Sequence, residues 1–157
     1  MPKPNCVIKF PQKRRTGRKG YKEEDFKKHL TTFFINVFQF FDDRFILIKG
    51  NSKPFEPDFT LIDEKDDINI FLDVEIDEPY EGINDISKRK ATHYQLADSN
   101  RNNAFKSRGW IVIRFAEIQV HQNPKGCCLF IADVIKNIYP QYNIPDTVLS
   151  ANQIEVR

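Results

Sequence analysis

The chain has 157 residues, of which 40% are hydrophobic, and a net charge of only +2. That length predicts one compact domain, and the 14 phenylalanines supply much of the apolar volume for its core. The Phe-rich segment 33–41 is too short to span a bilayer and no apolar signal opens the chain, so we expect a cytoplasmic protein without a membrane partner.

The charges are unevenly distributed along the chain. Residues 1–20 contain no acidic residue, and we expect them to form a basic flexible arm in which the sequence 7–10 leaves an edge strand open. Basic residues gather in three groups: Lys13, Arg14, Arg15, Arg18 and Lys19; Lys88, Arg89 and Lys90; and Arg101, Lys106 and Arg108. Acidic residues concentrate between Asp58 and Glu81. This distribution suits an enzyme that grips phosphates and needs a metal, or alternatively reflects a disordered tail and ordinary solvated faces.

A helix is predicted from about Lys22 to Phe40, because apolar side chains recur there at helical spacing. The stripe consists of Phe26, Leu30, Phe33, Phe34, Val37 and Phe41. Glu23 falls in line with this stripe. Its carboxylate is therefore either solvated at the helix start, where the helix dipole favours it, or aimed at a functional site.

Three strands, a helix, a strand and a last helix are predicted to follow. The strands are expected at 44–49, 58–63 and 69–77, and the helix from about 91 or 98 to Ser107, ended by Gly109 as a left-handed cap. The apolar run 110–115 is typical of a buried central strand, and the last helix precedes Pro140 with its two adjacent cysteines read as reduced core thiols. We therefore expect an α/β domain over 21–140, with helices around a mixed sheet of about four strands, and a tail at 141–157.

Two carboxylates on neighbouring strands, Asp58 and Glu75, form the candidate site. Alternation places Asp73, Glu75 and Asp77 on one face of their strand, and Asp73 is as readily an ion-pair partner as a site residue. A two-residue hairpin loop at 66–67 would set Thr60 against Asp73 and Asp58 against Glu75. Directly opposed residues of an antiparallel pair stand about 5 Å apart.

Two carboxylates at that separation repel each other unless a cation lies between them. An all-oxygen ligand set suits Mg²⁺, Mn²⁺ or Ca²⁺. Glu75 is the strongest candidate, because a carboxylate inside an otherwise apolar strand needs a partner. The sequence therefore predicts a divalent metal site built on these two strands.

Pro57-Asp58, followed by Glu75 on the next strand, resembles the PD-(D/E)XK nuclease superfamily, whose core is a helix, a three-stranded meander, a helix and a strand. The downstream motifs Val74-Glu75-Ile76-Asp77, Asp98-Ser99-Asn100-Arg101 and Gly109 to Phe115 resemble the branch around very-short-patch-repair endonucleases and their uncharacterised bacterial relatives. The resemblance covers roughly 23–139. It implies a restriction-endonuclease-like three-layer core.

The resemblance also implies an activity, hydrolysis of phosphodiester bonds in DNA by a metal-dependent endonuclease with Mg²⁺, or Mn²⁺ in its place. Asp58 and Glu75, with Asp77 or the carbonyl of Ile76, would hold the metal, and Glu23 would complete the shell through a water. His93 would be the general base or water positioner, or else a surface or capping histidine. By their charge, the candidate DNA-binding residues are Arg14, Arg15, Arg18, Lys19, Lys88, Arg89, Lys90 and Arg101.

One position departs from the superfamily pattern, because Asp77 stands where a lysine is expected two residues after the glutamate. Either Lys88, Lys90 or His93 replaces that lysine, or the chain is a catalytically degenerate module that binds nucleic acid or assembles with a partner. A small phosphorylated substrate is a weaker alternative, because no Gly-rich phosphate loop occurs.

Several neighbouring residues leave two interpretations open. Asp98 is an N-cap or part of the site. Arg101 binds a phosphate or pairs with Asp98 one turn away, and Arg114 makes a phosphate contact or an internal ion pair. Glu117 and Gln119 border the site or serve the start of a helix.

Overall fold

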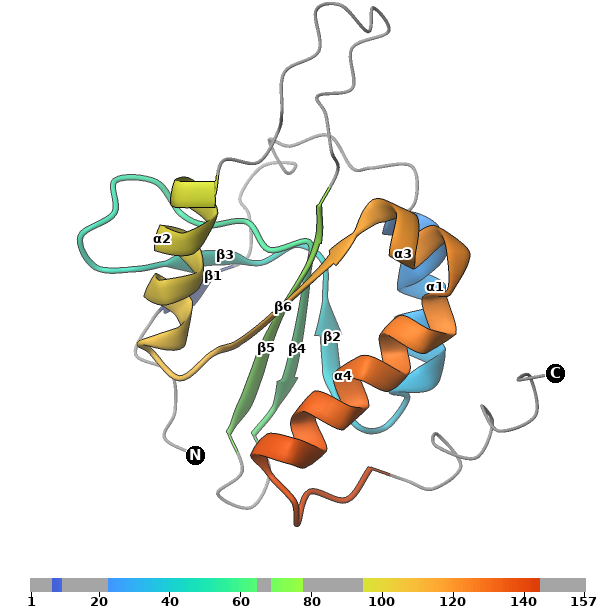
Figure 1. The fold of residues 1–157 in the computed structure, drawn as a ribbon. Coiled ribbons are helices and arrows are strands. Elements are labelled where there is room, and N and C mark those ends of the chain that lie inside the picture. The colour runs from blue at the N-terminus through green and yellow to red at the C-terminus, as the bar shows by residue number, and fades with distance from the viewer. Residues whose placement is uncertain (1–6, 10–22, 65–68, 78–94, 145–157) are drawn as a thin grey trace, which may run out of the picture.

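The computed structural model describes residues 7–9, 23–64, 69–77 and 95–144 (Figure 1). The strands are β1 (Val7–Lys9), β2 (Gln39–Phe41), β3 (Phe45–Leu47), β4 (Phe59–Asp63), β5 (Ile70–Asp77) and β6 (Ile111–Ala116). The helices are α1 (Glu23–Phe33), α2 (Gln95–Lys106), α3 (Glu117–Gln122) and α4 (Pro124–Ile138). None of these helices is long and apolar enough to cross a membrane.

A mixed four-stranded sheet in the order β2-β4-β5-β6 forms the centre of the fold. The pairs β2–β4 and β4–β5 are antiparallel, whereas β6 runs parallel to β5 after the crossover through α2. Helices α1, α3 and α4 lie together on one side of this sheet, and α2 lies on the other with the β1–β3 ribbon (Figure 1). The expected α/β class, with a four-stranded mixed sheet and flanking helices, is confirmed.

Two hydrophobic clusters lie on opposite faces of the sheet. The larger one joins α1 and α4 to the sheet, and alternate residues of β5, among them Leu72, Val74 and Ile76, belong to it. The smaller one holds Phe71 of β5 together with Phe105 of α2. Because side chains alternate along a strand, Asp73, Glu75 and Asp77 share the face of Phe71, toward α2. The packing thus directs the acidic residues of β5 to the α2 side.

The first helix ends earlier than its apolar stripe predicted, at Phe33 and not near Phe40. Asn36 adopts a left-handed backbone conformation with φ of 61°, which an α-helix cannot continue. The amide of Val37 then donates to the carbonyl of Phe34 at 3.0 Å, closing a turn. The following residues form β2, because aromatic side chains fit a pleated surface as well as they fit a helical stripe.

The first strand of the expected meander was also placed wrongly. Segment 44–49 contains β3, which pairs antiparallel with β1 in a separate ribbon, with Ile8 opposite Ile46. Its place beside β4 is taken by β2. The strand that the sequence left open at 7–10 is therefore present, over Val7–Lys9.

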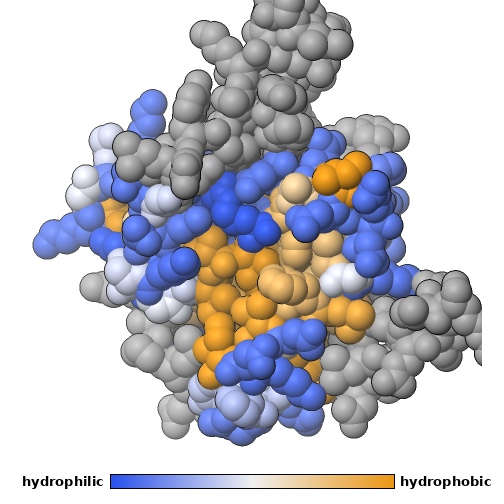
Figure 2. All heavy atoms as spheres, in the orientation of Figure 1, coloured by the Kyte–Doolittle hydropathy of each residue, from blue (hydrophilic) through white to orange (hydrophobic). Residues whose placement is uncertain are grey.

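Strand β6 lies at one edge of the described sheet, next to β5, and not in its centre. Its continuous apolar run has a different cause, because Ile111, Ile113 and Phe115 enter the large cluster while Trp110 and Val112 pack in the small one. Covered faces, and not a central position, explain the run. On the face of the molecule that Figure 2 shows, apolar side chains gather between α2 and α4.

The sequence signals for the two ends of α2 had different outcomes. Gly109 has φ of 89° in the turn that follows α2, as expected for a left-handed cap. Asp98 lies within the first turn of α2 and not before it, so the N-cap interpretation was wrong. Beyond Pro140, Tyr142 and Ile144 are still buried in the large cluster, and the Tyr142 hydroxyl donates to Asp63 Oδ2 at 2.5 Å.

Candidate functional site: a buried carboxylate cluster

Asp58 and Glu75 lie side by side because the strand register brings them there. Thr60 stands opposite Asp73 and Phe59 opposite Val74, as the predicted register required. The amide of Asp58 donates a hydrogen bond to Oε1 of Glu75 at 3.2 Å. In the other direction, the amide of Ile76 donates to Oδ2 of Asp58 at 2.8 Å. The hairpin loop at 66–67 lies outside the described residues.

Both carboxylates are buried, with 7% of Asp58 and 9% of Glu75 exposed to solvent. Asp73, two residues before Glu75 on the same face, is fully buried. Three acidic side chains therefore share a region with little water, which we call the carboxylate cluster: Asp58, Asp73 and Glu75. Buried carboxylates are stable only where positive charge or hydrogen-bond donors compensate them.

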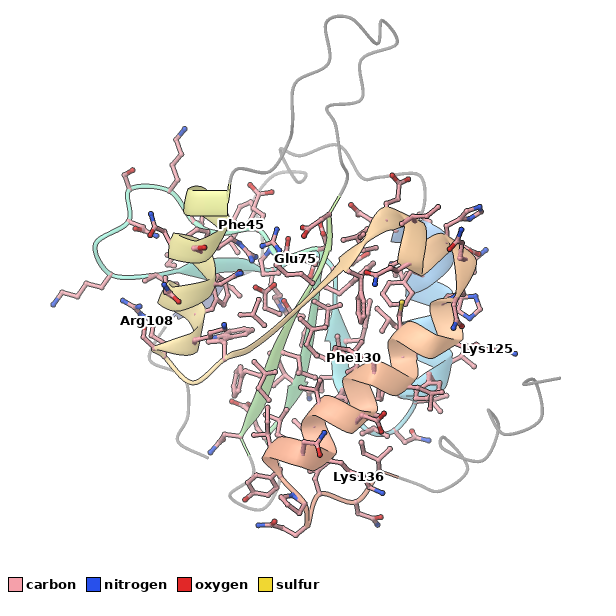
Figure 3. All side chains as sticks on the ribbon, viewed as in Figure 1. Phe45, Glu75, Arg108, Lys125, Phe130 and Lys136 are labelled. Atoms are coloured by element: carbon pink, nitrogen blue, oxygen red, sulfur yellow. The ribbon has the colours of Figure 1, made fainter. Side chains whose placement is uncertain are left out.

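Arg101 of α2 supplies the compensating charge. Its Nη2 lies 2.6 Å from Oε1 of Glu75 and 3.2 Å from Oδ1 of Asp73. Its Nη1 lies 2.9 Å from Oδ2 of Asp73, yet these two atoms lack any partner with hydrogen-bond geometry. The contact between them is an ion pair of favourable distance and poor alignment. One arginine thus bridges two of the three carboxylates. Figure 3 shows Glu75 on the side of β5 toward α2.

The pKa of Glu75 lies well above the usual value for a glutamate. Burial is the largest cause, followed by the negative charge of Asp73; the charge of Asp58 adds to the rise, and only Arg101 opposes it. For Arg101, burial alone would lower the pKa, but the charges of Asp73 and Glu75 outweigh burial and raise it. One guanidinium therefore does not neutralise the cluster, which favours any additional positive charge.

Asp77 faces a different partner. Arg114 of β6 binds it through two parallel hydrogen bonds, from Nε to Oδ2 at 3.0 Å and from Nη2 to Oδ1 at 2.5 Å. The Nη1 of Arg114 also donates to Oδ1 of Asn102 at 3.3 Å. Of the two interpretations of Arg114, the structure contains the internal ion pair.

The remaining candidates separate into buried, local and undescribed residues. Glu23, the first residue of α1, is only 7% exposed, so it is not solvated at the helix start. Gln119 serves the start of α3, where its Oε1 accepts a hydrogen bond from the amide of Ala116 at 2.9 Å. The following residues lie outside the described part of the chain: Arg14, Arg15, Arg18, Lys19, Lys88, Arg89, Lys90 and His93.

A metal ion fits the composition of this site better than its present arrangement. The carboxylate oxygens of Asp58 and Glu75 are ligands that Mg²⁺ and Mn²⁺ prefer. Within the described residues, however, no group of three or more acidic, histidine or cysteine side chains is placed to hold a metal. Arg101 lies against Glu75, and Asp77 is bound to Arg114.

The arginine bridge to Asp73 and Glu75 was missed by sequence reasoning, although Asp73 was open to an ion pair. A signal existed, because an arginine on the helix that packs over an acidic strand face has few other places for its charge. The sequence suggested two other partners for Arg101, a phosphate of the substrate and Asp98 one turn away. Spacing along one helix cannot show which strand a helix covers.

A cavity of about 420 Å³ lies beside the site, between β6 and the two helices that follow it. Arg114, Gln119, Gln122 and Phe130 are among its lining residues, and none of the carboxylate cluster is.

Comparison of the chain with protein-family models, with curated proteins and with solved structures finds no match.

Proposed function

We propose that the chain is a metal-dependent endonuclease that hydrolyses phosphodiester bonds in DNA, on a restriction-endonuclease-like core. The observation that carries this proposal is the placement of Asp58 and Glu75. They are adjacent and buried; the Glu75 carboxylate accepts a hydrogen bond from the amide of Asp58, and the Asp58 carboxylate accepts one from the amide of Ile76. Folding gains nothing from burying acids together, so a cluster of this kind points to a function that needs the charge.

Asp58 and Glu75 would hold Mg²⁺ or Mn²⁺, with the carbonyl oxygen of Ile76 as a third donor. Bound there, the ion would polarise the scissile phosphate and lower the pKa of a coordinated water. The two backbone hydrogen bonds fix the carboxylates before any ion arrives, which reduces the cost of ordering them. Asp77 is less suited as a ligand, because Arg114 already binds both of its oxygens.

DNA would be held mainly through its phosphates by the basic residues of the arm and of segment 88–90. Such contacts contribute affinity and position but little choice of sequence. His93 remains the candidate for orienting water. These residues support the proposed DNA binding by their charge and by their place in the sequence.

The alternative is a nuclease-like module that binds nucleic acid without cutting it. Two observations favour it: Arg101 lies against Glu75 at 2.6 Å, and the position of the expected lysine holds Asp77, bound to Arg114. In both features a carboxylate is held by an arginine and not by a metal.

Cleavage of supercoiled plasmid DNA separates the two functions. We expect nicking that requires Mg²⁺ or Mn²⁺ and falls by several powers of ten in Glu75→Gln, because a lost metal ligand costs several kcal/mol of transition-state stabilisation. Asp133→Asn, a change of an exposed acid on α4, is the matched control and should cut normally. DNA binding without any metal-dependent cleavage in the wild type would favour the non-cutting module.

A further inference from the structure

The guanidinium of Arg101 occupies the position where a cation would compensate the carboxylate cluster. It contacts Asp73 and Glu75 at once, and Glu75 is one of the two proposed metal ligands. Among the described residues, Arg101 sets one positive charge against the three negative charges that Asp58, Asp73 and Glu75 carry when all are ionised, which leaves an excess of two negative charges. A divalent cation would neutralise this remainder but would be repelled by the arginine.

The hold on Arg101 is incomplete. Nη1 and Asp73 Oδ2 are buried and 2.9 Å apart, yet neither has a partner with hydrogen-bond geometry. A permanent structural pair between arginine and aspartate normally forms two parallel, well-aligned hydrogen bonds. Arg114 of β6 and Asp77 of β5 form such a pair, and Arg101 and Asp73 do not.

Arg101 is the more exposed partner of its ion pair with Asp73. Its side chain is 14% exposed, in contrast to the fully buried Asp73. Its guanidinium lies over the rings of Phe105 and Phe55, 4.8 and 5.7 Å from the ring centres, so release from Glu75 would also change these two cation–π contacts.

We propose that Arg101 is an exchangeable internal counter-ion, which stabilises the carboxylate cluster in the metal-free protein and leaves Glu75 when a divalent cation binds. This inference rests on the proposed metal site. It adds that the two cations compete, so the affinity for metal is set partly by the arginine. Arg101 is a positioning residue in this account and does not touch the substrate.

The test measures Mn²⁺ binding to the full chain by isothermal titration calorimetry. Arg101→Gln removes the competing charge and should tighten Mn²⁺ binding about tenfold or more. The matched control is Arg108→Gln, because Arg108 lies in the turn that follows α2 and its Nη1 donates to the backbone carbonyl of Ala104 at 2.9 Å, away from the acids. Its Mn²⁺ affinity should equal that of the wild type.

A second variant guards against loss of folding. Arg101→Gln alone leaves three buried carboxylates uncompensated, whereas the double variant Arg101→Gln/Asp73→Asn keeps the nominal charge of the cluster at −2, as two negative charges. It should fold and should also bind Mn²⁺ more tightly than the wild type. The melting temperature of Arg101→Gln should fall without metal and recover with Mn²⁺ more than that of the wild type does.

The outcomes separate the inference from the function. Unchanged Mn²⁺ affinity in both variants, with binding in the wild type, would overturn the exchange and leave the metal site intact. Binding in the variants alone would support the exchange and would show that the natural chain is the non-cutting module. Absence of binding in every protein would remove the metal site and the exchange together.

Discussion

Arg114 binds both carboxylate oxygens of Asp77, at 3.0 and 2.5 Å, across the parallel pair β5–β6. Asp77 stands where the superfamily that the sequence resembles has a lysine, and here its carboxylate is bound by an arginine. The ion pair fastens the outer strand of the described sheet to its neighbour at the end near Glu75. Asp77 therefore has an ion-pair partner of its own in this structure.

Asp77→Asn is expected to lower the free energy of unfolding by about 1 kcal/mol, because the pair is partly solvated, with 30% of the Asp77 side chain exposed. Arg114→Gln should cost a similar amount, and the double variant less than the sum, as measured by urea denaturation in a double-mutant cycle. Plasmid nicking by Asp77→Asn should stay within about tenfold of the wild type. A loss as large as that of Glu75→Gln would place Asp77 among the metal ligands.

Glu75→Gln should stabilise the metal-free protein in a way that depends on pH. The pKa of Glu75 is raised on folding, so its contribution to stability is fully present below its unfolded pKa of about 4.3 and is lost as pH rises through the folded value. Glutamine does not titrate, and Arg101 keeps its contact with Asp73. We therefore expect equal melting temperatures near pH 4 and a variant more stable by about 2–5 °C at pH 8.

Thermal melts of both proteins in EDTA across that pH range check the expectation. Asp133→Asn, the exposed control, should show no pH-dependent difference from the wild type. A wild type that is more stable than Glu75→Gln at pH 8 would mean that attraction to Arg101 outweighs burial and the repulsion from Asp73 and Asp58.

The cysteines of α4 should be chemically inert in the folded protein. Burial raises the pKa of Cys127 to about 11 and that of Cys128 to about 12, with the neighbouring Cys127 adding to the second shift. Only the thiolate reacts rapidly, so at pH 8 both should react with a disulfide reagent at least about a hundredfold more slowly than in urea. A variant with Cys6→Ser isolates these two thiols. Rapid labelling of the folded protein would show that α4 opens.

The sequence predicted the strand register that brings the carboxylates together. It did not predict the arginine that compensates their charge. Alternation along 69–77 and an acidic turn before it were enough to predict the register that sets Thr60 against Asp73, because a slip of one residue would turn Leu72 and Val74 out of the core. The edges of the sheet were not predictable in the same way. Phe40 and Phe41 suit a helix stripe and a strand equally, and the pairing with β4 that makes them a strand is a tertiary contact. The position of Arg101 depended on which face α2 covers, a tertiary choice that helical spacing does not carry.

DNA binding should depend on salt through the basic arm, and β1 changes how this is measured. Deleting the arm would also remove Val7–Lys9, which pairs with β3, so the sharper variant changes five charges to glutamine and keeps the strand: Lys13, Arg14, Arg15, Arg18 and Lys19. If about four of them contact phosphates, the slope of log K against log salt on duplex DNA should shrink by roughly 3–4. Melting temperature should not change. An unaltered slope would move the phosphate contacts to Lys88, Arg89 and Lys90, whose replacement by glutamine should then reduce it.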